Sequence, residues 1–207
     1  MKDQKLNRLI KISFLGAMAF ILMLMQIQLP MFPQFLYLDF SDVPALIGAF
    51  ALGPIAGVVI ELLKNLLFGV IKGSTSMWVG ELANFLIGSI LVFTAGTFYK
   101  KHKNRTSALI GIVIGAIFMV VMASLLNYFI LIPFYAKLLG KSIEDIINWS
   151  AAANHYIVDL KALILWGIVP FNILKAVVEA FITMLLYKKI SPILHKDILH
   201  KKNEAKA

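Results

Sequence analysis

Long apolar runs recur along the whole chain and alternate with short polar connections. A run of about 20 apolar residues is the length that a helix needs to cross the hydrocarbon core of a bilayer. Two runs are shorter and meet at Gly53 and Pro54 without a charge at the turn, so we expect these helices to tilt or to be buried among neighbours. The pattern predicts six helices, at residues 9–29, 43–52, 55–71, 79–99, 107–135 and 162–187.

Two connections between these runs carry features of their own. Residues 30–42, PMFPQFLYLDFSD, hold two prolines and four aromatic residues and predict an extended loop. The aromatic side chains fit either a belt at the membrane interface or a lid over a pocket. Residues 136–161 form the longest connection, and the pattern SIEDIINWSAAANHYI within it is compatible with a short interfacial helix.

The composition narrows the class of protein. Of the 207 residues, 60% are hydrophobic and 15% are charged, whereas a soluble domain has about 25% charged residues. We therefore expect an all-α, polytopic membrane protein whose residues 1–207 form a single transmembrane domain. The first apolar run is long and is followed by Gln26, Gln28 and Pro30 rather than by a small-residue cleavage site, which favours a membrane helix over a cleaved signal peptide. The chain has no cysteine, which excludes disulfides and thiol catalysis.

The net charge of +9 is distributed unevenly along the chain. Four Lys and Arg residues precede the first apolar run, which starts at Ile12, four lie at residues 100–105 and six follow Tyr187, whereas the other three connections hold none, one and three. With six helices the three basic regions share one side, so the positive-inside rule places both termini in the cytoplasm. The basic regions would also favour anionic lipid headgroups, and their distribution argues against nucleic acid as a partner.

Polar residues recur inside the predicted spans, where each charge costs about 2.5–3.5 kcal/mol on insertion scales. Several share one helix face through a spacing of three or four residues. They are Glu61, Lys64 and Asn65; Glu81 and Asn84; Asn127; and Asn172, Lys175 and Glu179. One interpretation is that Glu61–Lys64 and Lys175–Glu179 are ion pairs that neutralise themselves. The other is that four helices contribute to a shared hydrated or ligand-filled interior.

The sequence gives little support for catalysis. The segment GVIKGSTS lacks the GxxxxGK[ST] spacing of a phosphate-binding loop, and neither HExxH nor another metal-ligand spacing of histidines occurs. His155 stands alone in a connection, and the other histidines lie in basic segments. We therefore expect a protein that is not an enzyme and has no metal site, with an intramembrane hydrolase as a less favoured alternative.

Several segments resemble a known family in their order along the chain. They are LDFSDVPALIGAFALGPIAG, ELLKNLL, GSTSMWVGELANFLIGS and FNILKAVVEAF. Together they resemble the substrate-binding S-components of energy-coupling factor (ECF) vitamin transporters, and among these the riboflavin-specific members most. The resemblance spans residues 9–190. It implies six helices with both termini inside, a multi-pass protein of the bacterial plasma membrane, and no cofactor. It also implies riboflavin as the transported ligand, bound from outside, with a transmembrane scaffold subunit and two ATPase subunits as partners.

The resemblance also implies roles for individual residues. Asn172 and Lys175 correspond to the residues that bind the edge of the flavin ring, and Glu81, Asn84 and Asn127 to positions that meet the ribityl hydroxyls or the remaining ring edge. Aromatic residues of the connections would cover the ring, namely Trp78, Tyr37 and Phe40. The first helix of the family docks the scaffold subunit through an Ala-x-x-x-Ala surface, where this chain offers Ser13, Gly16, Ala17 and Ala19.

The chemistry of the candidate residues leaves other ligands open. A buried lysine opposes a cationic ligand of the thiamine type, but Lys175 would suit the carboxylate of a biotin-like or folate-like vitamin. A proton-coupled secondary transporter is a further alternative, because Glu61 or Glu179 lies at membrane depth; Lys64 and Lys175, within one helical turn, would pair with these acids instead. No nucleotide-binding signature is present, so we expect the chain alone to bind its substrate without pumping it.

Overall fold

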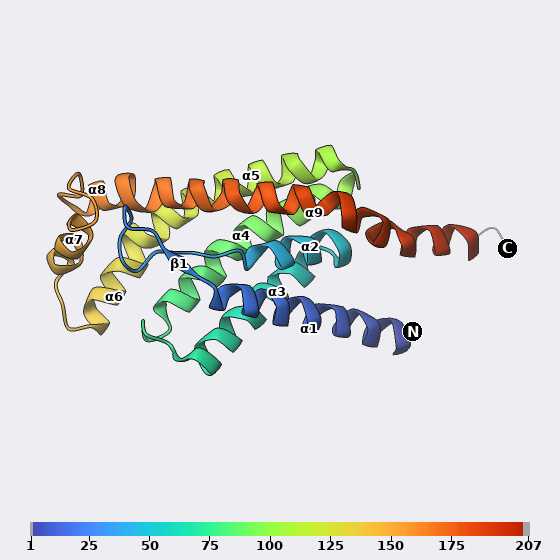
Figure 1. The fold of residues 1–207 in the computed structure, drawn as a ribbon, viewed down its shortest axis with the longest axis horizontal. Helices are drawn as coiled ribbons and strands as arrows, with labels where there is room; N and C mark the ends of the chain where they lie inside the picture. The colour runs from blue at the N-terminus through green and yellow to red at the C-terminus, as the bar shows by residue number, and fades with distance from the viewer. Residues whose placement is uncertain (1, 205–207) are drawn as a thin grey trace.

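The protein is an all-α bundle in the computed structural model, which describes the backbone of residues 2–204 and the side chains of residues 4–187 (Figure 1). The helices are α1 (Lys2–Leu24), α2 (Asp42–Leu52), α3 (Pro54–Leu67), α4 (Val79–Lys101), α5 (Arg105–Leu126), α6 (Ile132–Leu138), α7 (Ile143–Ala151), α8 (Leu160–Leu163) and α9 (Val169–Glu204). Three π-helical segments continue or connect them, η1 (Phe68–Gly73), η2 (Asn127–Leu131) and η3 (Ile164–Ile168). Two short strands, β1 (Ile27–Gln28) and β2 (Tyr37–Leu38), pair antiparallel.

Within the described residues, five helical stretches are long and apolar enough to cross a membrane, and the apolar helix α2 is shorter. The start of α1, the α4–α5 turn and the far end of α9 lie at one end of the bundle (Figure 1). The η1–α4 turn and the segment around α7 and α8 lie at the other end. A multi-pass membrane protein is therefore confirmed, while the cytoplasmic location of both termini stays a prediction. The six basic residues after Tyr187, on which that prediction partly depends, have side chains outside the described range.

The shortness of α2 follows from its position inside the bundle. Eight of its eleven residues are buried, so α2 packs against neighbouring helices and not against lipid. Gly53 ends α2 with a φ of +100°, which favours glycine, and Pro54 then starts α3 at a position where no backbone N–H is needed. Gly57 lets α3 approach α2, since a Cβ there would lie 2.9 Å from the carbonyl oxygen of Ala45.

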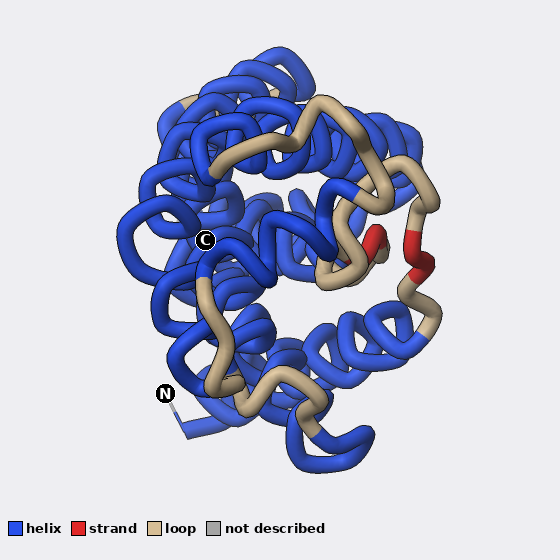
Figure 2. Tube along the Cα trace, turned by 90° about the vertical axis from the view of Figure 1, so that its left-hand side faces the viewer, coloured by secondary structure: helices blue, strands red, loops and turns tan. Residues whose placement is uncertain are grey.

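The first helix differs from its predicted range, residues 9–29. It ends at Leu24, because Ile27 and Gln28 leave the helix to pair with Leu38 and Tyr37. The polar residues and the proline that follow the apolar run therefore belong to a strap, residues 25–41, which runs from α1 to α2. Figure 2 shows its two strands, in red, beside the helices at one edge of the bundle.

Prolines account for two of the π-helical segments. Pro133 follows η2 and Pro170 follows η3, and a proline has no N–H to donate to the carbonyl oxygen one turn earlier. For Pro170 that oxygen belongs to Trp166, and the side-chain amide of Asn154 donates to it instead, at 3.4 Å. Such π-helical turns are frequent at functional sites.

The buried apolar residues form two clusters. The larger joins α2, α3, α4 and α5 around residues such as Leu46, Ile60 and Leu91, and the smaller joins α6, α7 and η3 around Ile146 and Ile168. Many large apolar side chains on the outside of the long helices are exposed, as expected for a surface that faces lipid.

Candidate functional site

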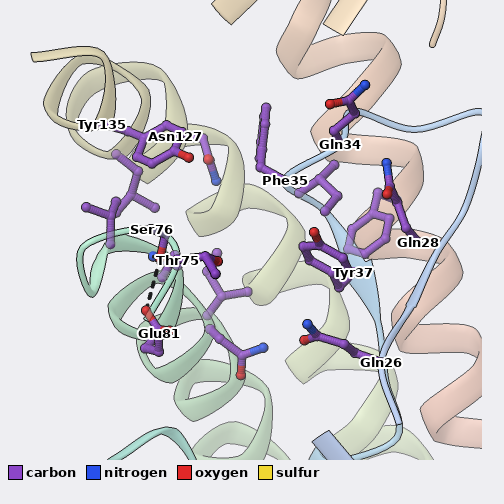
Figure 3. Close-up of a pocket in the computed structure, with 18 of the residues that line it drawn as sticks. Gln26, Gln28, Gln34, Phe35, Tyr37, Thr75, Ser76, Glu81, Asn127 and Tyr135 are labelled. Atoms are coloured by element: carbon purple, nitrogen blue, oxygen red, sulfur yellow. Dashed lines mark hydrogen bonds between the residues drawn. The ribbon is translucent and has the colours of Figure 1, made fainter. Parts of the chain in front are cut away.

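A cavity of about 440 Å³ opens beside the smaller apolar cluster, which contributes Ile132 and Ile146 to its lining. Its walls come from the strap, the start of α4, η2 and α6, α7, and the beginning of α9. Figure 3 shows Gln26, Gln28, Gln34 and Tyr37 of the strap on one side and Asn127, Tyr135, Ser76 and Glu81 on the other. The volume lies within the range typical of small-molecule sites.

One wall of the cavity is formed by a single face of α9. Asn172 and Lys175 both line it, since their spacing of three residues places them on one helix face. Both residues are almost fully buried. The amide nitrogen of Asn172 donates to the carbonyl oxygen of Ile168 at 2.8 Å, which leaves the amide oxygen available to a ligand. Asn127 on η2 repeats this arrangement, donating to the carbonyl oxygen of Ala123 at 2.8 Å. The cavity therefore presents two fixed, neutral amide groups.

Lys175 does not stand in the cavity wall as an unpaired cation. Its ammonium nitrogen lies 3.4 Å from a carboxylate oxygen of Asp42, 3.5 Å from one of Asp39 and 3.7 Å from one of Glu179. The sequence suggested the pair with Glu179, but the two aspartates, which end the strap and begin α2, were missed as partners. The signal for them was the DFSD segment directly before a buried helix.

A second lysine joins the same group of charges. Lys64 on α3 pairs with Asp42, lies 2.8 Å from a carboxylate oxygen of Glu61 and donates to the hydroxyl of Ser41 at 2.8 Å. Asp42 thus contacts both lysines, and the two self-neutralising pairs expected from the sequence merge into one buried charge cluster. We define this cluster as Asp39, Asp42, Glu61, Lys64, Lys175 and Glu179.

The turn before α4 forms another part of the cavity. Glu81 lines the cavity and accepts hydrogen bonds from the hydroxyls of Ser74 at 2.8 Å and Ser76 at 3.0 Å. Its carboxylate therefore holds the turn in place. Asn84, one turn further along the same face of α4, also lines the cavity, and its amide oxygen lies 3.5 Å from the amide nitrogen of Asn65.

Among the aromatic residues expected to cover a ring, the structure places only Tyr37 in the cavity wall. Trp78 adopts a left-handed conformation with a φ of +70°, and its ring lies over Gly69, where a Cβ would be 2.3 Å away. Phe40 is turned aside because successive residues of an extended segment point in opposite directions, and Tyr37 and Asp39 take the cavity face. The aromatic residues that sequence reasoning missed are Phe35, Phe68, Tyr135, Trp149 and Phe171.

The four residues suggested for partner docking divide between two faces of α1. Gly16 and Ala19 are buried against the bundle, and a Cβ on Gly16 would lie 3.2 Å from the side chain of Leu63. These two residues serve the internal packing of α1. Ser13 and Ala17 lie on the exposed face, four residues apart, and are the pair that remains accessible to another helix.

The segment that carries α7 is held by a capping box outside the spans. The backbone N–H and the hydroxyl of Ser142 donate to the carboxylate of Asp145 at 2.8 and 2.9 Å, and these hydrogen bonds lower the pKa of that carboxyl group. This cap positions α7, which brings Trp149 and Ser150 to the cavity. Among the described residues, no group of three or more His, Asp or Glu side chains has a geometry suited to a metal ion.

Comparison with known proteins agrees with this architecture. The chain is 39% identical to the riboflavin transporter RibU of Staphylococcus aureus (strain TCH60), over 93% of this chain and 95% of the relative. It is 33% identical to the riboflavin transporter FmnP of Bacillus subtilis (strain 168), over 91% and 94%. A solved structure of the S component of a bacterial ECF transporter superposes with a TM-score of 0.74 at 36% identity, covering 93% of this chain and 99% of that one. The family model for the ECF transporter, substrate-specific component, matches residues 7–187, and the chain belongs to this family.

Proposed function

We propose that this chain binds riboflavin in the cavity and acts as the substrate-binding subunit for riboflavin uptake by an ECF transporter. The observation that carries the proposal is the lining of the cavity: aromatic and aliphatic walls, with the neutral amides of Asn127 and Asn172 and the charge-balanced Lys175 among the polar groups. Riboflavin is flat, apolar on its faces, polar along one ring edge and hydroxylated on its chain, so it matches such a lining. The two relatives described above carry riboflavin in their names, which supports the same ligand.

The polar residues of the cavity that the sequence singled out each have a place in this proposal. Asn172 and Lys175 would meet the polar edge of the flavin ring, with the free amide oxygen of Asn172 as acceptor. Asn84, Asn127 and Glu81 would meet the ribityl hydroxyls or the remaining ring edge. Tyr37 from the strap and Trp149 from α7 would cover the ring faces.

The alternative of a biotin-like or folate-like vitamin requires the carboxylate of the ligand to pair with Lys175. Three carboxylate groups of the protein already lie within 3.7 Å of that ammonium group. An anionic ligand would have to displace or repel them, and close like charges are unfavourable at low dielectric. The arrangement at Lys175 therefore favours a neutral ligand edge over a carboxylate.

As an S-component, the chain would work with a transmembrane scaffold subunit and two ATPase subunits in the bacterial plasma membrane, with both termini in the cytoplasm. The exposed face of α1 with Ser13 and Ala17 is the proposed docking surface for the scaffold, because small residues let helices approach closely. Proteoliposomes that contain this chain alone should bind riboflavin saturably without accumulating it, whether or not a proton gradient is applied. Accumulation should require the scaffold, the ATPases and ATP; accumulation driven by the gradient alone would make the chain a secondary transporter.

The direct test of the ligand is the absorbance spectrum of the purified protein. A flavin spectrum after purification, and saturable quenching of tryptophan fluorescence on titration of flavin-free protein with riboflavin, are the expected results. Titrations with biotin and folate serve as matched controls and should leave the fluorescence unchanged. Binding of either of these and not of riboflavin would replace the proposed ligand.

A further inference from the structure

Beneath the cavity, the charge cluster links three helices through one carboxylate. Asp42 is fully buried at the start of α2, and its two oxygens contact different lysines: Oδ1 pairs with Lys64 of α3, and Oδ2 lies 3.4 Å from Lys175 of α9. Lys175 lines the cavity, whereas Lys64 and Asp42 do not. Asp42 is therefore a buried contact between a residue of the cavity wall and a helix behind that wall.

The two lysines are held differently. Lys64 is fully buried and has close contacts with Asp42, with the hydroxyl of Ser41 at 2.8 Å and with the carboxylate of Glu61 at 2.8 Å. The three carboxylates around Lys175 all lie at 3.4–3.7 Å, longer than the 2.7–2.9 Å of a direct charge-assisted hydrogen bond. Lys64 thus fixes the Asp42 carboxylate. The positive charge of Lys175 is balanced by the surrounding carboxylates, but its ammonium group can still donate hydrogen bonds to a ligand.

Helix α4 leaves the space that this arrangement needs. A Cβ on Gly88 would lie 2.6 Å from Oε2 of Glu61 and 3.4 Å from Oδ2 of Asp42. The absence of a side chain at Gly88 therefore lets both carboxylates sit between α3, α4 and α9 directly below the cavity, which Gly88 also lines. The cluster is built into the packing of the bundle at the base of the cavity.

We propose that Asp42, anchored by Lys64, is a positioning residue that holds the Lys175 ammonium group at the cavity wall in the orientation that meets the ligand. The inference rests on the proposed riboflavin site and goes beyond it by assigning a role to two residues that do not touch the cavity. Without the Asp42 charge, Lys175 is attracted only by Asp39 and Glu179 and moves from its position between the three carboxylates. Binding then weakens because the donor is displaced, even though every cavity-lining residue is retained.

A double-mutant cycle in riboflavin affinity separates positioning from a general structural role. The four proteins are the wild type, Asp42→Asn, Lys175→Met and the double variant, each titrated by tryptophan quenching in the full chain. We expect Asp42→Asn to weaken riboflavin binding roughly tenfold in the wild-type background and less than about threefold when Lys175 is already Met, since contacting residues couple and independent ones add. An equal loss in both backgrounds would overturn the inference, because a structural effect of Asp42 does not depend on Lys175.

Two further variants complete the experiment. Lys64→Gln removes the anchor, and its effect on riboflavin affinity should likewise be smaller when Lys175 is already Met. If Asp42→Asn does not fold, Lys64→Gln replaces it in the cycle. Equal losses of affinity in both backgrounds would again overturn the inference. Thr183→Val is the control, since Thr183 is buried on α9 two turns beyond Lys175, and it should leave affinity unchanged. Wild-type affinity in Lys175→Met would overturn the ligand role of Lys175 and this inference with it, whereas a wild type that binds no riboflavin would overturn the proposed function itself.

Discussion

The long helices run through both ends of the bundle, but the two ends are packed in different ways (Figure 1). At the end where α1 begins and α9 ends, α4 and α5 approach closely, because a Cβ on Gly111 or Gly115 would lie 2.8 Å from a backbone carbonyl oxygen of α4. Tyr99 and Tyr187 are joined there at 3.1 Å between their hydroxyls. The opposite end holds the strap, three π-helical segments and the cavity.

This difference in packing explains how one short chain combines a rigid bundle with a binding site. At one end, glycines on α5 permit close backbone contact with α4. At the other end, Pro133 and Pro170 follow irregular turns, and buried asparagines occupy positions where apolar residues would close the bundle. The charge cluster lies between the two regions and ties α2, α3 and α9 together.

The largest expected effect concerns which end faces the cell interior. The chain has no cysteine, so single cysteines can be placed at His102 in the α4–α5 turn and at Lys141 beside α7 without background. We expect a membrane-impermeant thiol reagent to label Lys141→Cys in intact cells and to leave His102→Cys unlabelled until the cells are opened. His102 is chosen because the neighbouring Asn104 caps α5, accepting from the backbone of Ser107 at 2.8 Å. The reverse labelling pattern would invert the proposed topology.

At the cavity end, Asn172→Ala and Lys175→Ala should each weaken riboflavin binding by about 1.5–3 kcal/mol, the range for hydrogen bonds that involve charged or buried groups. Both variants should still insert into the membrane. The control is Ile173→Ala, between them on α9 but on the exposed face. Titration of the purified variants measures the effect, and wild-type affinity in both would remove α9 from the binding site.

At the packed end, Gly115→Val should lower the stability of the protein by about 1–3 kcal/mol, since the added side chain forces α5 away from α4. The matched control is Val113→Ile, which adds a methylene on the exposed side of the same helix. Thermal unfolding in detergent, without ligand, is the measurement. If the two variants unfold at the same temperature, close α4–α5 contact does not stabilise this end.

Tryptophan fluorescence offers a smaller and more local contrast. Trp149 lines the cavity, whereas Trp78 lies over Gly69 and the ring of Trp166 contacts Tyr156, with a centroid distance of 5.6 Å. Trp149→Phe should therefore remove the largest share of the quenching caused by riboflavin. Trp78→Phe should leave most of that quenching in place. The opposite ranking would indicate that the turn before α4 moves over the cavity when ligand binds.

The smallest effect expected is a pH dependence confined to α7. Hydrogen bonds from Ser142 lower the pKa of Asp145 in the folded protein. The cap therefore stabilises α7 fully at pH values above the ordinary pKa of an aspartate. This contribution is lost as the pH falls through the lower, folded value. In the wild type, the protection of the α7 amides from hydrogen exchange, taken relative to the intrinsic exchange rate at each pH, should fall on acidification. Asp145→Asn should show lower protection already at neutral pH and lack the acid step. Protection that is the same in both proteins and at each pH would show that packing alone holds α7.

The class of protein, most of the helices and the polar face of α9 could be predicted from the residues alone. These follow from local rules: apolar runs of membrane length predict spans, and a spacing of three residues places Asn172 and Lys175 on one face of any helix. The short helices on either side of Gly53 were also predictable, since a glycine followed by a proline marks the end of one helix and the start of the next.

The partners of these residues depend on the folded arrangement of the helices and could not be predicted from local patterns. The pairing of β1 with β2 ended α1 five residues before its predicted boundary, and the positive φ of Trp78 turned its ring away from the cavity. Burial divided the small residues of α1 between packing and exposure. The spacing of Lys175 and Glu179 suggested a local pair, but Asp39 and Asp42 reach the same lysine from more than 130 residues away. A spacing rule describes one helix, whereas a buried charge pairs with whichever groups the fold brings to it, because burial costs the charge its hydration.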